Sequence, residues 1–153
     1  MPNFEKALEL GKRVEEIVLN RVRESDPFAL IIKGKFKQFD IYSPSTNTRI
    51  EVKSDIQSQH TQNFLVEVYM YGKPSALLST EADIWCFFDN LNLIWVKPTR
   101  IKDLILEKGY TQRVITGKGD TKSKRCYLIP TKEIYSISNK VESVHEKERI
   151  KTI

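Results

Sequence analysis

The sequence predicts a single α/β domain over residues 1–153, in which helices flank one mixed central sheet of about five or six strands. Two observations carry this prediction. A helical pattern at residues 3–24 precedes a hairpin pattern at 36–54, and further strand-like segments then alternate with helix-like ones. With 153 residues, the chain has the length of one domain with its own hydrophobic core.

The N-terminal helix is predicted over residues 3–24, with Asn3 as its N-cap. Glu15 falls within the apolar stripe of this helix, where a carboxylate is costly unless it is paired or binds a cation. Alternatively, Glu15 lies at the edge of the stripe and bonds to Lys12 or Arg21. The stripe consists of Phe4, Leu8, Gly11, Val18 and Val22.

Between the helix and the hairpin, the short apolar segment 28–32 is predicted as an edge strand or as the lead-in to the hairpin. Lys33, Lys35 and Lys37 follow at alternate positions, so they would share one face of an extended chain. These lysines either line a nucleic-acid backbone or blunt the pairing of an exposed sheet edge.

The strongest strand signal lies in the segments 36–42 and 49–54, which are joined by the turn-forming run SPSTNT. This arrangement is typical of a β-hairpin. We place the centre of the turn between Ser45 and Thr46, which fixes the pairing of the two strands. Alternation then directs one set of side chains toward the core, namely Phe39, Ile41, Ile50 and Val52.

The opposite face of the hairpin is charged. The register places Asp40 across from Glu51, with Lys53 on the same face. Facing carboxylates repel each other, and a hard divalent cation such as Mg²⁺, or Mn²⁺ in its place, would reverse the sign of that interaction. Lys53 would then lie where it can orient a water nucleophile or stabilise charge on a phosphate. The alternative is a solvated, purely structural hairpin face.

The spacing of Asp40, Glu51 and Lys53 resembles the PD-(D/E)XK nuclease superfamily, with Glu51 and Lys53 as the E-x-K motif. Phe39 occupies the position of the proline in that motif. The resemblance implies a restriction-endonuclease-like fold with an αβββαβ core, as in resolvases, homing endonucleases and phage nucleases. It also implies that Asp40 and Glu51 bind the metal and that Lys53 is catalytic.

Two further features extend this resemblance. Many members carry an acidic residue on the first helix in a Gly-x-x-x-Glu setting, which Gly11 and Glu15 match. Glu15 is therefore expected to complete the metal site and to take part in catalysis. Phage and prokaryotic members also show an Asn followed four residues later by a Glu, as in Asn63 and Glu67.

After the hairpin, residues 54–63 are predicted as a loop, in which His60 is either a substrate contact or an ordinary loop residue. The apolar segment 64–70 is predicted as a central strand beside the hairpin. On such a strand, Glu67 needs a partner, which we expect at Lys53 or in the metal shell.

A turn then leads to a predicted short helix at 75–82, and Lys73 and Ser75 at its start are candidates for contacting a DNA phosphate. Strands at 83–88 and 93–96 are predicted to form a second hairpin.

A helix is predicted at 100–108, a last short strand at 126–130, and a polar extension at 131–153. Between them, 111–125 is rich in glycine and basic residues and is predicted as a loop that contacts a nucleic-acid backbone, or else as a plain surface loop. The basic candidates there are Lys118, Lys122, Lys124 and Arg125.

Charge and composition narrow the function classes. Lys and Arg total 25 against 20 Asp and Glu, and the net charge of +5 suits a polyanionic partner. Cys86 and Cys126 lack metal-ligand spacing and there are two His, so we expect buried, reduced thiols and no zinc site. We find no membrane span or signal peptide, and expect a cytoplasmic protein of a prokaryote or a phage-infected cell.

These observations predict a Mg²⁺-dependent DNA endonuclease without a small-molecule cofactor. One active site cuts one strand, so a homodimer or higher homo-oligomer is expected. Two alternatives remain at this point. One is a non-catalytic nucleic-acid-binding or assembly subunit that retains the nuclease fold, and the other is an α/β interaction module whose charged hairpin face is solvated.

Overall fold

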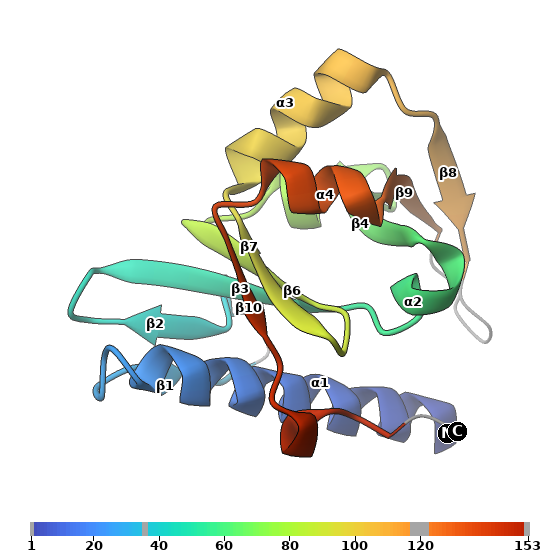
Figure 1. Ribbon diagram of the computed structural model, residues 1–153. Coiled ribbons are helices and arrows are strands. Elements are labelled where there is room, and N and C mark those ends of the chain that lie inside the picture. The colour runs from blue at the N-terminus through green and yellow to red at the C-terminus, as the bar shows by residue number, and fades with distance from the viewer. Residues whose placement is uncertain (1, 35–36, 117–122, 152–153) are drawn as a thin grey trace.

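The computed structural model describes residues 2–34, 37–116 and 123–151 (Figure 1). Within these ranges it shows a mixed α/β fold with four α-helices, a six-stranded mixed sheet and a four-stranded antiparallel sheet. The helices are α1 (Pro2–Arg23), α2 (Ser58–Thr61), α3 (Pro98–Lys108) and α4 (Thr131–Ile137), with 3₁₀ helices η1 (Ala76–Leu78) and η2 (Glu146–Glu148). The strands are β1 (Leu30–Ile31), β2 (Ile41–Ser43), β3 (Thr48–Ser54), β4 (Asn63–Met70), β5 (Lys73–Pro74), β6 (Ile84–Phe88), β7 (Asn92–Val96), β8 (Gln112–Ile115), β9 (Lys124–Pro130) and β10 (Lys140–Ser143).

The larger sheet has the order β1-β2-β3-β6-β7-β10. All neighbouring strands are antiparallel except β3 and β6, which are parallel. A parallel pair needs a crossover connection, and here the crossover contains α2, β4, β5 and η1. The predicted mixed sheet is therefore confirmed.

The prediction of one sheet is wrong, because a second sheet with the order β5-β4-β9-β8 stands beside the first. The segment predicted as a central strand next to the hairpin is β4, and it pairs with β9 instead. Much of the predicted basic loop at 111–125 forms β8 and the start of β9. Lys118 and Lys122 lie outside the described residues. Strand patterns in the sequence show which segments are extended, but not which distant partner each one finds.

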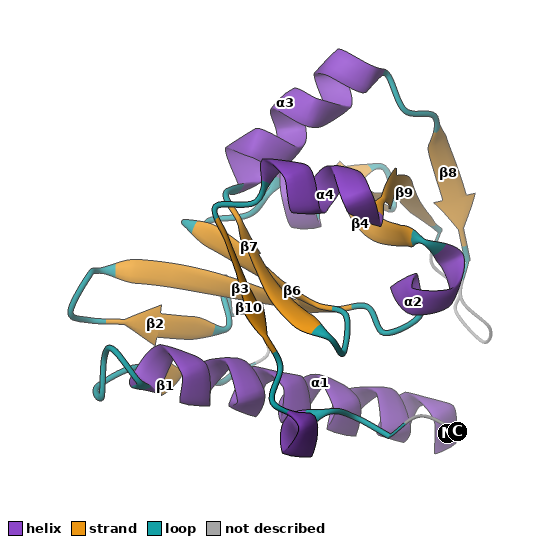
Figure 2. Ribbon diagram, in the orientation of Figure 1, coloured by secondary structure: helices purple, strands orange, loops and turns teal. Residues whose placement is uncertain are grey.

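The strands β6 and β7 are apolar except for Asn92, and all but the first residue of each is buried, because both of their faces are covered. On β6, Cys86 and Phe88 pack with α1 in one hydrophobic cluster, while Trp85 and Phe87 pack with β4, β9, α3 and α4 in another. The helix α1 accordingly covers one face of the sheet, and the second sheet and the later helices lie on the other (Figure 2).

The N-terminal helix is confirmed, but it begins at Pro2, so Asn3 lies inside its first turn rather than at the N-cap. Its buried stripe also differs from the prediction, since Leu8 is exposed. The helix meets the sheet with its middle and C-terminal part, so its first turns have no sheet to cover. The residues that pack are Leu10, Val14, Ile17, Val18, Leu19 and Val22.

The predicted hairpin at 83–96 and the helix at 100–108 are confirmed as β6, β7 and α3. Pro98 is the first helical residue of α3, and Gly109 ends the helix with φ 64°. The helix predicted at 75–82 is reduced to the single turn η1, and the predicted loop 54–63 contains α2. The C-terminal segment supplies α4 and the edge strand β10 rather than a plain extension.

Both cysteines, Cys86 and Cys126, are buried and free, as predicted. Across the described residues, no helix combines the length and the apolar character needed to cross a membrane.

The two sheets are joined by Phe64 of β4 and Phe87 of β6, whose ring centroids lie 4.8 Å apart in the core. We predict that Phe64→Ala lowers the free energy of unfolding by about 3–5 kcal/mol, because it leaves a cavity between the sheets. Urea denaturation measures this loss. The exposed neighbour Leu65 is the control, and Leu65→Ala should change stability by less than about 1 kcal/mol. Equal losses in both variants would contradict the packing described.

Candidate active site

The hairpin of β2 and β3 brings the predicted acidic residues together. Its register pairs Ile41 with Ile50, as the predicted turn centre requires. Asp40 directly precedes β2 and donates its backbone N–H to the carbonyl of Ile50 at 2.9 Å. Its carboxylate Oδ2 accepts the N–H of Val52 at 2.7 Å, so the side chain caps the strand pair where β2 begins. Phe39 lies before β2 and contacts the ring of Tyr42 instead of joining the core as predicted.

Asp40 and Glu51 lie in side-chain contact and are both largely buried. Burial raises the pKa of Glu51 to about 7; Lys53 opposes this rise, and the neighbouring Asp40 carboxylate adds to it. Burial also acts to raise the pKa of Asp40, but hydrogen bonds from Glu51, the Val52 N–H and Lys37 hold it below its usual range. Glu51 therefore carries a proton below about pH 7, and in that form it can donate a hydrogen bond to Asp40.

Lys53 lies on the same face of β3 as Glu51, as predicted. Its Nζ is 3.4 Å from Glu51 Oε2 and 4.9 Å from the centre of the Trp85 ring. Trp85 is the register partner of Glu51 on the parallel strand β6. The ammonium is thus held between a carboxyl group and an aromatic face, which restricts a side chain that is otherwise flexible.

Glu15 reaches the same place from α1, but through a lysine. The Nζ of Lys37 lies 2.9 Å from Glu15 Oε1 and 2.9 Å from Asp40 Oδ1. Burial raises the pKa of Glu15, the hydrogen bond from Lys37 lowers it, and the charge of Asp40 raises it. The four predicted catalytic residues and Lys37 therefore form one chain of contacts, in the order Glu15, Lys37, Asp40, Glu51 and Lys53.

This arrangement fits a Mg²⁺ ion at Asp40 and Glu51 better than at all three acidic residues. Among the residues that the structure describes, no group of three or more His, Cys, Asp and Glu side chains is gathered to hold a metal. The ammonium of Lys37 bridges Glu15 and Asp40 at 2.9 Å each, and the Glu15 side chain also contacts Asp40. Mg²⁺ commonly uses one or two carboxylates and takes water and phosphate oxygens for its other positions, so the contacting pair Asp40 and Glu51 meets that requirement.

Two pockets with basic borders flank the carboxylates. One, of about 540 Å³, is bordered by Lys12, Lys33 and Lys37 beside Glu15. The other, of about 240 Å³, lies between the two sheets and is bordered by Lys53, Trp85, Glu67 and Lys124, among others.

The prediction that Glu67 pairs with Lys53 is wrong. Glu67 pairs with Lys124 at 3.8 Å, although it shares a pocket with Lys53.

Of the other predicted nucleic-acid contacts that the structure describes, Lys73, Ser75 and Arg125 are not among the residues that line these two pockets, whereas Lys33 is. Lys73 is exposed on the short edge strand β5, and Arg125 is exposed on β9. Ser75 donates its backbone N–H to Val68, while its hydroxyl is buried without a hydrogen-bond partner. Lys35 lies outside the described residues, and Lys33 is not in a strand. His60 is exposed in α2.

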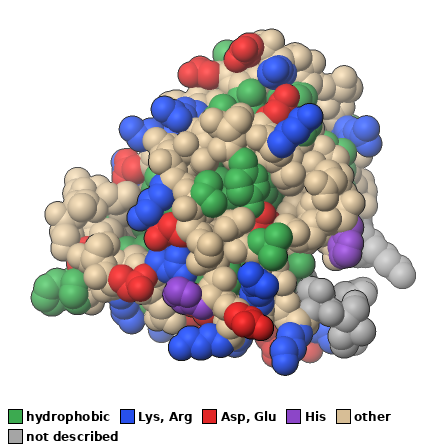
Figure 3. Space-filling model, in the orientation of Figure 1, with side chains coloured by type: hydrophobic (Ala, Val, Ile, Leu, Met, Phe, Trp, Pro, Cys, Tyr) green, Lys and Arg blue, Asp and Glu red, His purple; other side chains and the backbone are tan. Residues whose placement is uncertain are grey.

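On the molecular face shown in Figure 3, basic and acidic side chains are interspersed. The excess of positive charge does not form one uniform patch on that face. On that face a polyanion would meet acidic side chains among the basic ones rather than a broad basic surface.

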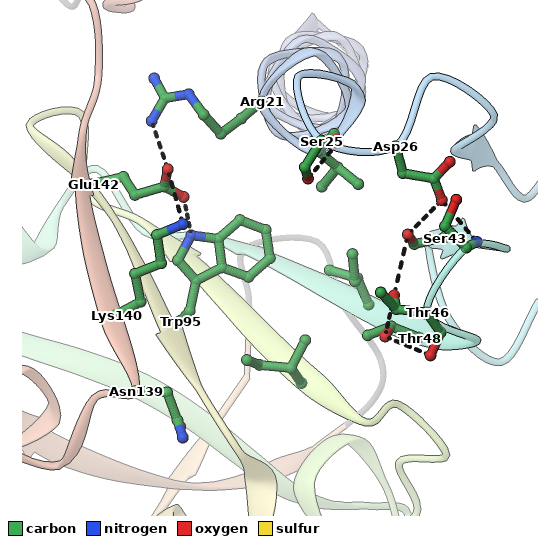
Figure 4. Close-up of a pocket in the computed structure, with 14 residues that line it drawn as sticks. Arg21, Ser25, Asp26, Ser43, Thr46, Thr48, Trp95, Asn139, Lys140 and Glu142 are labelled. Carbon is green, nitrogen blue, oxygen red and sulfur yellow. Dashed lines mark hydrogen bonds and ion pairs between the residues drawn. The ribbon is translucent and has the colours of Figure 1, made fainter.

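A third pocket, of about 420 Å³, contains none of the predicted site residues (Figure 4). Its polar side chains bond to one another. Glu142 accepts the indole N–H of Trp95 at 2.7 Å and pairs with Arg21 at 3.6 Å, while Asp26 accepts the Ser43 hydroxyl at 2.7 Å. That hydrogen bond lowers the pKa of Asp26 to about 2. These hydrogen bonds and ion pairs therefore connect α1 and the residues that follow it to the hairpin and to β10.

Two residues of the site were not predicted as part of it. Lys37 was expected on a strand face beside Lys33 and Lys35, and Trp85 lies within the strand predicted at 83–88 but was given no role. The signal for Lys37 was its position three residues before Asp40, which allows a short ion pair when the chain is not extended. No local signal identifies Trp85, because its contact with Lys53 depends on the parallel pairing of β3 with β6.

Comparison with known proteins finds no matching family model, no matching curated protein and no matching solved structure. The resemblance to the nuclease superfamily therefore rests on the residues of this chain and their geometry.

The raised pKa of Glu51 predicts a pH-dependent cost of keeping this site folded. The native state holds the proton up to about pH 7, whereas the unfolded chain releases it near 4.5. The contribution of Glu51 to the free energy of unfolding therefore has its full value below about pH 4.5 and is lost as the pH rises to about 7. We predict that Glu51→Gln, which cannot ionise, is more stable than the wild type above about pH 7.5 in a chelating buffer, by at most about 3 kcal/mol.

Urea denaturation across this pH range measures the difference, which should vanish near pH 4.5. Glu16→Gln is the control, because Glu16 is exposed on α1 next to Glu15. A wild-type protein that is as stable as Glu51→Gln at every pH would disprove the buried, shared proton.

Proposed function

We propose that this protein is a Mg²⁺-dependent deoxyribonuclease of the PD-(D/E)XK type that cleaves DNA internally. The observation that carries the proposal is the contact between the buried carboxyl groups of Asp40 and Glu51, with Lys53 3.4 Å from Glu51 on the same strand face. Carboxyl groups forced together in this way attract a divalent cation, and a lysine beside them suits a reaction at phosphate.

The order of elements also supports a restriction-endonuclease-like core. A helix, α1, is followed by the antiparallel strands β1, β2 and β3, and the chain then crosses over to β6, which is parallel to β3. This order matches the αβββαβ core, with one departure. The crossover has only the four-residue helix α2 and the turn η1, and it carries the strands β4 and β5 of the second sheet.

In the proposed reaction a water oxygen attacks the phosphorus, and the bond from phosphorus to the leaving 3′ oxygen breaks. The products are a 5′-phosphate and a 3′-hydroxyl. Asp40 and Glu51 would hold Mg²⁺, which supplies positive charge to the reacting phosphate. Lys53 either orients the attacking water and takes part in removing its proton, or neutralises the charge that builds up on the phosphate oxygens.

The hydrogen bond from Val52 matters to this chemistry because it fixes Asp40. Glu51 releases its proton when the cation is bound, since a ligating carboxyl group must be ionised. Each chain offers one such site, so cutting both strands of a duplex calls for a homodimer or a higher homo-oligomer.

One observation favours a second candidate function. Lys37 already neutralises Glu15 and Asp40 at 2.9 Å each, as expected of a protein that uses this site only structurally. In that case the protein would be a non-catalytic nucleic-acid-binding or assembly subunit that retains the fold.

We predict that Mn²⁺ or Mg²⁺ raises the melting temperature of the wild type, since a ligand that binds only the native state stabilises it. At a free metal concentration of about 100 times Kd, the gain is about 2.7 kcal/mol. Asp40→Asn should abolish the rise, because it keeps an acceptor for the Val52 N–H but removes the charge. Asp83→Asn is the control, since Asp83 is paired with Arg49 at 3.1 Å and belongs to no proposed ligand set. An equal rise in wild type and Asp40→Asn would refute metal binding at this pair.

We predict metal-dependent cleavage within a panel of linear, supercoiled, branched and single-stranded DNAs. Lys53→Met should lower the cleavage rate by about 10²–10⁴-fold, the usual contribution of a positioned acid or base. Glu51→Gln should abolish cleavage. Lys108→Met, which changes an exposed lysine of α3 paired with Glu133, should cleave like the wild type. Binding of DNA without cleavage of any substrate would instead support the non-catalytic subunit.

A further inference from the structure

Lys37 makes the shortest charged contacts in the site. Its ammonium lies 2.9 Å from Glu15 on α1 and 2.9 Å from Asp40 at the start of β2. The two carboxylate side chains are only 16% and 12% exposed, whereas Lys37 is 30% exposed. Partly buried carboxylates need a counter-charge, and Lys37 supplies it to both.

The same lysine borders the pocket of about 540 Å³ described above. The other charged groups on its border are Lys12, Lys33, Glu15 and Glu16. While Lys37 is paired with the carboxylates of the site, its charge is not available to this pocket. If it turned away from them, three ammonium groups would face a space that adjoins the proposed metal site.

A divalent cation at Asp40 and Glu51 would weaken the ion pair between Lys37 and Asp40. The cation and the ammonium would then compete for the same Asp40 carboxylate and repel each other at short range. The lysine side chain is long and flexible enough to move a few ångströms without a change in the backbone. The pocket bordered by Lys12 and Lys33 lies directly beside it.

We propose that Lys37 couples metal binding to the binding of a nucleic-acid phosphate in this pocket. When a divalent cation occupies the carboxylates, the Lys37 ammonium turns into the pocket and binds a phosphodiester next to the one that is cleaved. Without the cation, Lys37 neutralises Glu15 and Asp40 and leaves the pocket to Lys12 and Lys33. This inference rests on the proposed function, since it presumes a metal at Asp40 and Glu51.

The test compares wild type, Lys37→Met and Lys33→Met. Calorimetry with Ca²⁺ alone measures metal affinity, and fluorescence anisotropy measures the Kd of a short labelled single-stranded DNA with and without Ca²⁺ at constant ionic strength. Lys37→Met should bind Ca²⁺ about tenfold more tightly than the wild type, because the competing ammonium is gone. It should weaken DNA binding about tenfold in the presence of Ca²⁺ and leave it nearly unchanged in its absence.

Lys33→Met is the matched control, since its lysine borders the same pocket. It should weaken DNA binding by the same factor with and without Ca²⁺ and leave Ca²⁺ affinity unchanged. A direct contact between Ca²⁺ and DNA would affect Lys37→Met and Lys33→Met equally. It therefore cannot produce the expected difference between the two variants in the Ca²⁺ dependence of DNA binding. Lys37→Arg keeps the charge and should behave like the wild type in Ca²⁺ binding.

Unchanged or weaker Ca²⁺ binding by Lys37→Met would overturn the proposal, as would an equal loss of DNA affinity with and without Ca²⁺. Both results leave the proposed nuclease intact. If neither the wild type nor Lys37→Met binds Ca²⁺, Mn²⁺ or Mg²⁺, the proposed function itself fails, and the coupling fails with it. Thermal unfolding of each variant in a chelating buffer shows that a loss of binding is not a loss of folding.

Discussion

The hydrogen bond from the Val52 N–H to the Asp40 carboxylate, at 2.7 Å, governs the geometry of the whole site. The strand β2 begins only at Ile41, opposite Ile50, so the N–H of Val52 further along β3 would be left without an acceptor in a partly buried place, and such a group is costly. The Asp40 side chain satisfies it and is thereby fixed beside Glu51. Once fixed, the Asp40 carboxylate adds to the rise in the pKa of Glu51 that burial causes, and it gives Lys37 a stable partner at 2.9 Å. Lys53 lies 3.4 Å from Glu51, further along the same strand.

The larger sheet limits where such charges can be placed. Its central strands β6 and β7 are buried on both faces, by α1 on one side and by the second sheet with α3 and α4 on the other. A charged residue on those strands would be sealed in the core. The strand β3 lies between this core and the short outer strands β1 and β2, so it carries Ile50 on the buried side and Glu51 and Lys53 on a face that is still partly open. The candidate site therefore lies at the margin of the core, where burial shifts the pKa of Glu51 but leaves the side chains of Glu51 and Lys53 partly exposed.

Local patterns in the sequence predicted much of the hairpin and of the charged side chains at the edge of the core. The turn between β2 and β3 fixed the pairing of Ile41 with Ile50, and alternation then placed Glu51 and Lys53 together. Glu15 was found because a carboxylate in an apolar stripe needs a partner. Longer-range features were missed, because their cause lies far away in the chain. The strand β4 has the composition of a central strand but pairs with β9, and Lys53 meets Trp85 only through the parallel pairing of β3 and β6. Lys37 was missed because its segment was taken as extended, whereas it makes an ion pair with Asp40 three residues later.

The charges of the site explain why one proton is bound and suggest what replaces it. Glu15, Asp40 and Glu51 would bring three negative charges, and Lys37 and Lys53 bring two positive ones. One proton completes the neutralisation, in keeping with the pKa of about 7 at Glu51. Replacing that proton with a divalent cation leaves one positive charge in excess. A phosphodiester carries one negative charge, so its binding would restore neutrality in a site where unpaired charge is costly. Lys37 contacts the carboxylates and also borders the neighbouring pocket. In the proposed coupling, its ammonium is therefore the positive charge that pairs with the bound phosphodiester.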